Sequence, residues 1–177
     1  MSRSTVACVV VALVVLGTGC GQRSASNSGG GVVMPVVDDD PQMSAAETHA
    51  RETVGTFLTA LKNPTPGQTG FQFKMRLVDP SKPEEGEAIW LSQPTFDGTN
   101  LHGVILDGDQ PEHVLVAHVG DHLTEIPANI IDWSFQDGGK PRGGYTTRVM
   151  YLEATPEEQV QLRKETGYTD AELRSTD

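Results

Sequence analysis

The 177-residue sequence contains only two cysteines, Cys8 and Cys20. Cys8 lies within an apolar stretch near the start of the chain, which we expect to be removed with the first 19 residues. A mature chain that begins at Cys20 then keeps one cysteine, so it cannot form an internal disulfide. We therefore expect the folded part to be held together by packing of its core.

Long apolar stretches are also missing, because Val6 to Leu16 is much shorter than the roughly 20 residues of a membrane span. A basic start at Arg3, a short apolar stretch and small residues form the layout of a secretory signal. The segment Gly17–Cys20 resembles the lipobox of bacterial lipoproteins, in which the cysteine becomes the lipidated first residue. Gly17 stands where such boxes usually carry leucine. The alternative is an ordinary signal peptide with a chance cysteine.

Basic residues are scarce, since 13 Lys and Arg face 24 Asp and Glu for a net charge of −11. This balance argues against nucleic acid as a partner, because phosphate binding requires basic surface. It also argues against a helix lying on anionic lipid, which requires a face rich in Lys and Arg. We predict an exported cell-envelope protein that lipid on Cys20 anchors to a membrane. The membrane could be the outer or the cytoplasmic one.

Three regions follow from the composition along the chain. Residues 1–19 are the predicted lipoprotein signal peptide, residues 20–40 a flexible tether rich in Ser and Gly, and residues 41–177 a single domain. The apolar patch Val32–Val37 interrupts the tether. It could pack on the domain or be part of the linker.

Helices are predicted at both ends of the domain. Asp40-Pro41 is typical of an N-cap followed by proline in the first turn, and apolar residues recur at helical spacing up to the stop at Asn63-Pro64. Thr155-Pro156-Glu157-Glu158 predicts a second helix that ends near Thr166. The same signal at Thr169 predicts a short terminal helix.

Strands are predicted between these helices. Apolar and polar residues alternate over Phe71–Leu77, which predicts a strand whose Lys74 faces solvent. Further strands are predicted at 87–91, 101–106, 114–117, 122–126, 130–135 and 145–152. The expected fold class is α+β, with the N-terminal helix packed on a strongly bent antiparallel sheet or small, partly open barrel of six or seven strands. One or two C-terminal helices complete it.

With these elements placed, the chain resembles the YegJ-like bacterial family, catalogued as domain of unknown function 2314. The resemblance runs from Met43 to about Leu152 and is carried by the Ala-rich N-terminal helix and by these stretches: 71–74, 87–91, 101–105, 131–134 and 143–148. The loop Leu106–Pro111 departs from the family pattern, because it is longer and carries Asp where the family usually has Asn. The resemblance supports the fold and implies no established activity.

The possible ligand-binding residues are Trp90, Asp132, Trp133, Tyr145 and Arg148. One interpretation pairs Asp132 with Arg148 and places the aromatic rings around a shallow ligand site. The other makes the same pair structural, joining two neighbouring strands, with both tryptophans in the core. We favour the second, and no catalytic residue is assigned.

Motifs for metal, phosphate or nucleophilic chemistry are not found. His118 and His122 are four residues apart, but Gly120 between them indicates a turn, and with His113 they form no helical metal motif. Gly138-Gly139-Lys140 lacks the rest of a phosphate loop, and no Gly-x-Ser-x-Gly elbow is present. We predict neither a metal nor a cofactor.

The leading functional hypothesis is a non-catalytic binding or interaction module, of unknown protein or small-molecule partner, held to the envelope by lipid. A second is a small hydrolase or transferase with its site around Asp132, Trp133 and Arg148. A third is an immunity-type protein that masks a basic toxin, for which an acidic surface is suited. Convergence of the three named residues in an open cleft would favour the second hypothesis.

Overall fold

The computed structural model describes residues 40–112, 114 and 116–175. The predicted signal peptide, Cys20 and all of the tether before Asp40 lie outside these residues. The elements in chain order are α1 (Pro41–Lys62), β1 (Gln68–Asp79), β2 (Lys82–Phe96), β3 (Leu101–Val104), β4 (His122–Glu125), the short 3-10 helix η1 (Pro127–Asn129), β5 (Asp132–Asp137), β6 (Lys140–Gly143), α2 (Tyr145–Glu153), α3 (Pro156–Thr166) and α4 (Asp170–Leu173).

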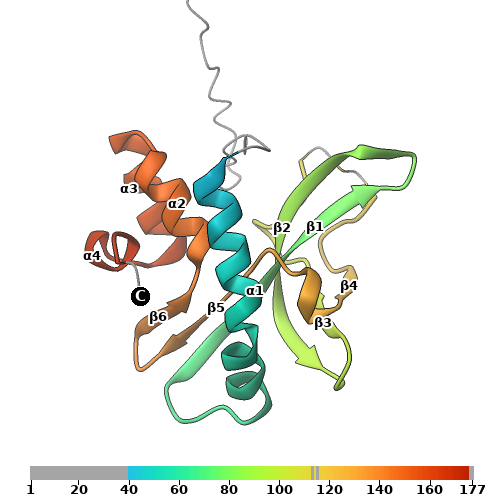
Figure 1. Ribbon diagram of the computed structural model, residues 1–177, viewed down its shortest axis with the longest axis horizontal. Helices are drawn as coiled ribbons and strands as arrows, with labels where there is room; N and C mark the ends of the chain where they lie inside the picture. The colour runs from blue at the N-terminus through green and yellow to red at the C-terminus, as the bar shows by residue number, and fades with distance from the viewer. Residues whose placement is uncertain (1–39, 113, 115, 176–177) are drawn as a thin grey trace, which may run out of the picture.

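The six strands form one antiparallel sheet in the order β4-β3-β2-β1-β5-β6. Figure 1 shows α1 crossing in front of the sheet, with α2, α3 and α4 on one side of α1 and the long, curved β1–β2 hairpin on the other. The sheet is bent and does not close into a barrel. The predicted α+β class, with helices at both ends of the chain, is confirmed.

The first helix begins as its sequence predicts. The Asp40 side chain accepts a hydrogen bond from the backbone N–H of Gln42 at 2.8 Å, and Pro41 occupies the first turn. Such a cap satisfies one of the N–H groups that a helix start leaves without a partner. The helix ends at Lys62 with Asn63 as its C-cap. The buried face of α1 then packs on the sheet.

The apolar side chains form two clusters. The larger joins α1 to the sheet and includes Phe57, Phe73, Leu91 and Trp133, each at most 2% exposed. The smaller lies among the C-terminal helices and consists of Tyr151, Ala154, Leu162, Tyr168 and Leu173. The C-terminal helices therefore have an apolar core of their own, and α2 links it to the sheet.

The two C-terminal helices were predicted from their first residues. Thr155 and Glu158 form the capping box of α3, and Thr169 and Glu172 repeat it at the start of α4. In each box, the threonine hydroxyl accepts from the backbone of the glutamate, and the glutamate carboxylate accepts from the backbone of the threonine. Both predictions are confirmed.

The strand predicted at 145–152 is wrong, because these residues form the helix α2. Thr146, Thr147 and Val149 are β-branched and favour a strand locally. Gly143 and Gly144 override that preference, since both adopt left-handed backbone conformations, with φ of 72° and 71°. They turn the chain away from the sheet, and the final strand is β6, which ends at Gly143.

The strand predicted at 114–117 is also absent, because the described residues Val114, Val116 and Ala117 belong to a loop. The backbone N–H groups of Glu112 and Val114 donate to the Glu87 carboxylate and not to a neighbouring strand. Val114 and Ala117 are nevertheless buried in the larger cluster. Their apolar side chains are therefore explained by burial in the core and not by pairing in a strand.

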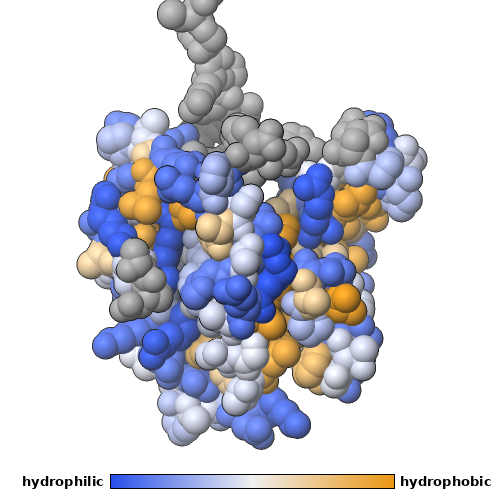
Figure 2. All heavy atoms as spheres, viewed as in Figure 1, coloured by the Kyte–Doolittle hydropathy of each residue, from blue (hydrophilic) through white to orange (hydrophobic). Residues whose placement is uncertain are grey.

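The face in Figure 2 is mostly hydrophilic, with smaller apolar areas. The exposed large apolar residues of the described chain are Leu106, Val116, Val119, Ile126, Leu152 and Val160. Among the residues that the structure describes, no helix has both the length and the apolar character needed to cross a membrane.

Candidate functional site

Three of the residues that could form a site lie in one row across the sheet. Lys74 on β1 pairs in register with Trp90 on β2 and with Asp132 on β5. Because residues directly opposite each other in a sheet point to the same face, the three side chains project together. The row ends at β5, beside the start of α2.

Asp132 is fully buried and its carboxylate is occupied. One oxygen, Oδ1, accepts a hydrogen bond from the Trp133 backbone N–H at 2.8 Å. The other, Oδ2, accepts from the backbone N–H and the hydroxyl of Thr146, at 2.8 and 2.7 Å. Burial raises the pKa of Asp132 above its ordinary value, and the hydrogen bonds from Thr146 act in the opposite direction.

The carboxylate of Asp132 serves as a cap for α2. The N-cap residue of this helix is Gly144, which has no side chain to satisfy the first N–H groups. Asp132 comes from a different strand and takes over that role at Thr146, where the partial positive charge of the helix start favours an anion. The residue is therefore placed by helix capping as well as by the sheet.

Lys74 is buried, which overturns the expectation that its side chain faces solvent. Its Nζ donates a hydrogen bond to the Thr146 hydroxyl at 3.3 Å and lies 5.3 Å from the centre of the Trp90 ring. Burial lowers the pKa of Lys74, while the negative charges of Asp132 and Glu47 raise it. Alternation along β1 correctly put Lys74 on the face opposite Phe73, but that face is covered too.

Thr146 joins the two charges through one oxygen. Its hydroxyl donates to Asp132 and accepts from Lys74, and the residue is only 1% exposed. We call Lys74, Asp132 and Thr146 the Asp132 centre. Sequence reasoning missed Lys74, because strand alternation gave it a solvated position. It also missed Thr146, because the segment was predicted as a strand and not as a helix start.

Arg148 does not form the predicted pair with Asp132. It lies on α2 and not on a neighbouring strand, and its guanidinium lies 5.7 Å from the centre of the Tyr145 ring. The cation whose charge acts on Asp132 is Lys74. The prediction failed because a helix, and not a strand, follows Gly144.

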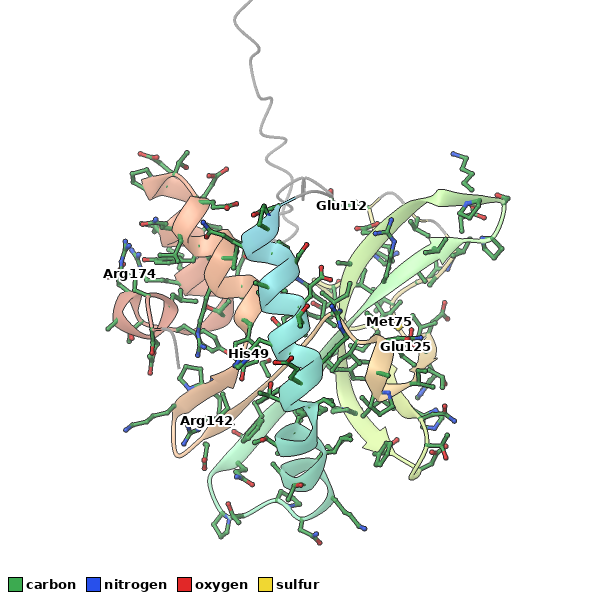
Figure 3. All side chains as sticks on the ribbon, in the orientation of Figure 1. His49, Met75, Glu112, Glu125, Arg142 and Arg174 are labelled. Carbon is green, nitrogen blue, oxygen red and sulfur yellow. The ribbon has the colours of Figure 1, made fainter. Side chains whose placement is uncertain are left out.

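Trp133 faces the opposite side of the sheet from Trp90. Its Nε1 donates to the backbone carbonyl of Ala50 on α1 at 3.0 Å, and its ring lies edge-on to Tyr145 with centres 5.7 Å apart. Tyr145 also meets His49 of α1 edge-on, at 4.6 Å between ring centres. Figure 3 shows His49 on the side of α1 toward α2. The two tryptophans therefore do not form facing walls of one site.

The Asp132 centre is arranged as a structural junction. The carboxylate and the bridging hydroxyl already have partners within the chain, and Asp132 and Thr146 are inaccessible to a substrate. A general acid or base must reach the proton that it transfers, and a nucleophile must reach its substrate. The geometry joins β1, β5 and α2 and offers none of these groups to a ligand.

The described histidines are not grouped as the ligands of a metal site would be. Among the residues that the structure describes, no three His, Cys, Asp or Glu side chains are grouped closely enough to hold a metal ion. His118 approaches Asp121 at 3.8 Å, and His102 approaches Asp97 at 3.0 Å. His113 lies outside the described residues.

The fold and the Asp132 centre define a class of protein: an α+β domain with one open antiparallel sheet, whose central strand is tied to a C-terminal helix by a buried lysine and aspartate. The chain belongs to the family described as uncharacterized protein conserved in bacteria (DUF2314), whose profile matches residues 40–169. The predicted family is thus confirmed.

Two curated relatives match the chain. The uncharacterized protein YegJ of Escherichia coli K12 is 29% identical over 125 residues, which cover 71% of this chain and 77% of YegJ. A putative ankyrin repeat protein of Neisseria meningitidis serogroup B is 30% identical over 81 residues, or 44% of this chain and 31% of that protein. This chain therefore matches less than a third of the meningococcal protein. No solved structure matches.

Proposed function

We propose that the chain is an exported protein, anchored to a membrane through lipid on Cys20, whose domain acts as a binding or interaction module in the cell envelope. We favour binding over catalysis because the Asp132 carboxylate is already hydrogen-bonded inside the protein. This buried carboxylate accepts three hydrogen bonds within the chain. The alternative hydrolase or transferase around Asp132, Trp133 and Arg148 would need that group to face a substrate.

The anchor rests on the sequence that precedes the domain. A basic start, a short apolar stretch and small residues end at Cys20. Each buried methylene of an acyl chain contributes about 0.8 kcal/mol, so more than one chain is needed for stable attachment. The scarcity of basic residues leaves lipid as the means of attachment that the sequence supports.

The charge of the chain supports a basic partner. A net charge of −11 attracts basic proteins over a distance of about 10 Å at 0.1 M salt, and salt screens that attraction. An immunity-type protein that masks a basic toxin is one form of such a module. The same charge does not favour nucleic acid or anionic lipid.

The anchor is tested by substituting each cysteine in turn. Cys20→Ser should move the protein from the membrane fraction to the soluble fraction, because the thiol that would carry the lipid is lost. Cys8→Ser is the matched control and should leave the protein with the membrane. If Cys20→Ser stays with the membrane after a high-salt wash, the anchor lies elsewhere.

The binding role is tested by affinity capture from detergent-solubilised envelopes at several salt concentrations. A basic protein that is retained at low salt and released as salt rises would support the proposal. Recovery of no partner, or of partners whose retention does not depend on salt, would contradict the charge argument.

A further inference from the structure

A second polar cluster lies at the β3–β4 edge of the sheet, at the opposite end of the strand order from β5 and β6. The Oδ2 atom of Asp97 is 3.0 Å from Nε2 of His102, and Nδ1 of His102 is 2.9 Å from Oγ1 of Thr124. Asp97 follows β2, and His102 pairs in register with Thr124 across β3 and β4. The three side chains thus form a line of carboxylate, imidazole and hydroxyl, away from the Asp132 centre.

Asp97 is held in place as an anion. Its Oδ1 accepts the backbone N–H groups of Thr99 and Asn100, at 2.8 and 2.7 Å. These bonds and the contact with His102 hold the pKa of Asp97 far below its ordinary value. An ionised carboxylate only accepts hydrogen bonds, so Nε2 of His102 carries the proton that faces it.

The tautomer of His102 sets the direction of the second bond. With the proton on Nε2, Nδ1 of the neutral ring has a lone pair, and the Thr124 hydroxyl donates to it. A hydroxyl, a base that accepts its proton and a carboxylate that orients the base are the parts of an activated nucleophile. Thr124 is exposed and the His102 side chain is 38% exposed, so a reagent can reach both.

We propose that Asp97, His102 and Thr124 form an acyl-accepting site for an activated ester or thioester. The Oγ of Thr124 forms a bond to the carbonyl carbon while its proton passes to Nδ1 of His102. The bond from that carbon to the leaving oxygen or sulfur then breaks, and the leaving group takes the proton from His102. The products are an ester on Thr124 and a free alcohol or thiol, with Asp97 ionised throughout to stabilise the protonated ring.

This site goes beyond the proposed binding function, because it performs a group transfer. It also lies apart from the Asp132 centre, on β3, β4 and the turn after β2. Its test is treatment of the purified full-length protein with p-nitrophenyl acetate, followed by peptide mapping of the acetylated residue by mass spectrometry. Wild type should carry one acetyl group on Thr124. His102→Gln should slow that acetylation about 100-fold or more, the usual contribution of a general base.

Two variants of Thr124 test whether its hydroxyl is the group that is acetylated. Thr124→Ser keeps a hydroxyl and should still be acetylated at position 124, whereas Thr124→Val should lose the label there. Thr95→Val is the matched control, because Thr95 is exposed and lies opposite His102 on β2, whereas the His102 ring bonds to Asp97 and Thr124. It should leave acetylation of Thr124 unchanged.

Two results would overturn the proposal. One is an absence of acetyl on Thr124 in both wild type and Thr124→Ser. The other is acetylation at Thr124 that proceeds equally fast in His102→Gln, since the hydroxyl would then react without its base.

Discussion

The carboxylate of Asp132 accepts both the backbone N–H and the hydroxyl of Thr146, at 2.8 and 2.7 Å. A residue of β5 therefore caps α2, a helix whose own N-cap is Gly144. The same hydroxyl accepts from Lys74 on β1. One threonine thus couples the central strand, its neighbour and a C-terminal helix.

Thr146→Val should destabilise the domain by about 1–3 kcal/mol, because it removes the hydroxyl and leaves two buried polar groups short of a partner. Thr147→Val is the matched control. Thr147 is also buried on α2, but its hydroxyl forms no hydrogen bond within the described chain. Urea denaturation of both variants measures the difference, and equal losses would contradict the bridging role of Thr146.

Lys74→Met and Asp132→Asn should each destabilise the domain by about 1–3 kcal/mol, because each disturbs a buried hydrogen bond to the Thr146 hydroxyl. The double variant should lose less than the sum of the two, because each single change leaves the other charge uncompensated. Arg148 supplies the comparison, since it lies beside Tyr145. In double-mutant cycles, the coupling between Asp132 and Lys74 should exceed that between Asp132 and Arg148; the reverse order would restore the pair predicted from the sequence.

Gly143→Ala should prevent normal folding. A Cβ at this position would lie 2.0 Å from the backbone oxygen of Trp133 and 2.6 Å from its ring, and the φ of 72° is unfavourable for alanine. Gly139→Ala is the control, because its φ of 79° is similar but a Cβ there meets nothing within 4 Å. It should cost only about 1–2 kcal/mol, the cost of the left-handed conformation. Thermal unfolding compares the two, and similar melting temperatures would show that Gly143 is not sterically constrained.

Asp109 should make the domain lose stability as pH rises from about 4 to about 6. Burial raises the pKa of Asp109 from 3.8 to about 6, so the unfolded chain releases this proton at lower pH than the folded chain does. Below this range both states hold the proton, and above it the folded state bears the full cost of the buried charge. Asp109→Asn should therefore remove this part of the pH dependence.

The measurement for Asp109 is urea denaturation at a series of pH values. Asp107→Asn is the control, because it removes an exposed carboxyl group from the same loop and keeps Asp109. A wild-type profile that matches that of Asp109→Asn would mean that Asp109 titrates normally in the folded protein.

The helices with strong caps could be predicted from the sequence. Asp40-Pro41 at α1 and the threonine–glutamate pairs at α3 and α4 act within a few residues, so local sequence carries the information. Alternation likewise located β1 and the buried face that carries Phe73. These elements need no knowledge of distant residues.

The candidate site could not be predicted in the same way. α2 begins where it does because of a capping residue on a distant strand, and its threonines locally favour a strand. Lys74 is buried because a second layer covers the other face of β1, which alternation along one strand does not reveal. The line through Asp97, His102 and Thr124 depends on the register of β3 against β4 and on the turn after β2.

The central place of β1 in the sheet also has a consequence for folding kinetics. Short turns join β1 to β2 and β2 to β3, and the longer segment 105–121 joins β3 to β4. The pairing of β1 with β5 joins residues that lie much farther apart in the sequence than those of the β1–β2 hairpin, so it carries a larger loop-closure entropy. Because Lys74 of β1 must reach Thr146 of α2 across β5, the contacts of α2 with β1 depend on this pairing. The C-terminal helices should therefore gain protection from hydrogen exchange later than the β1–β2 hairpin during refolding.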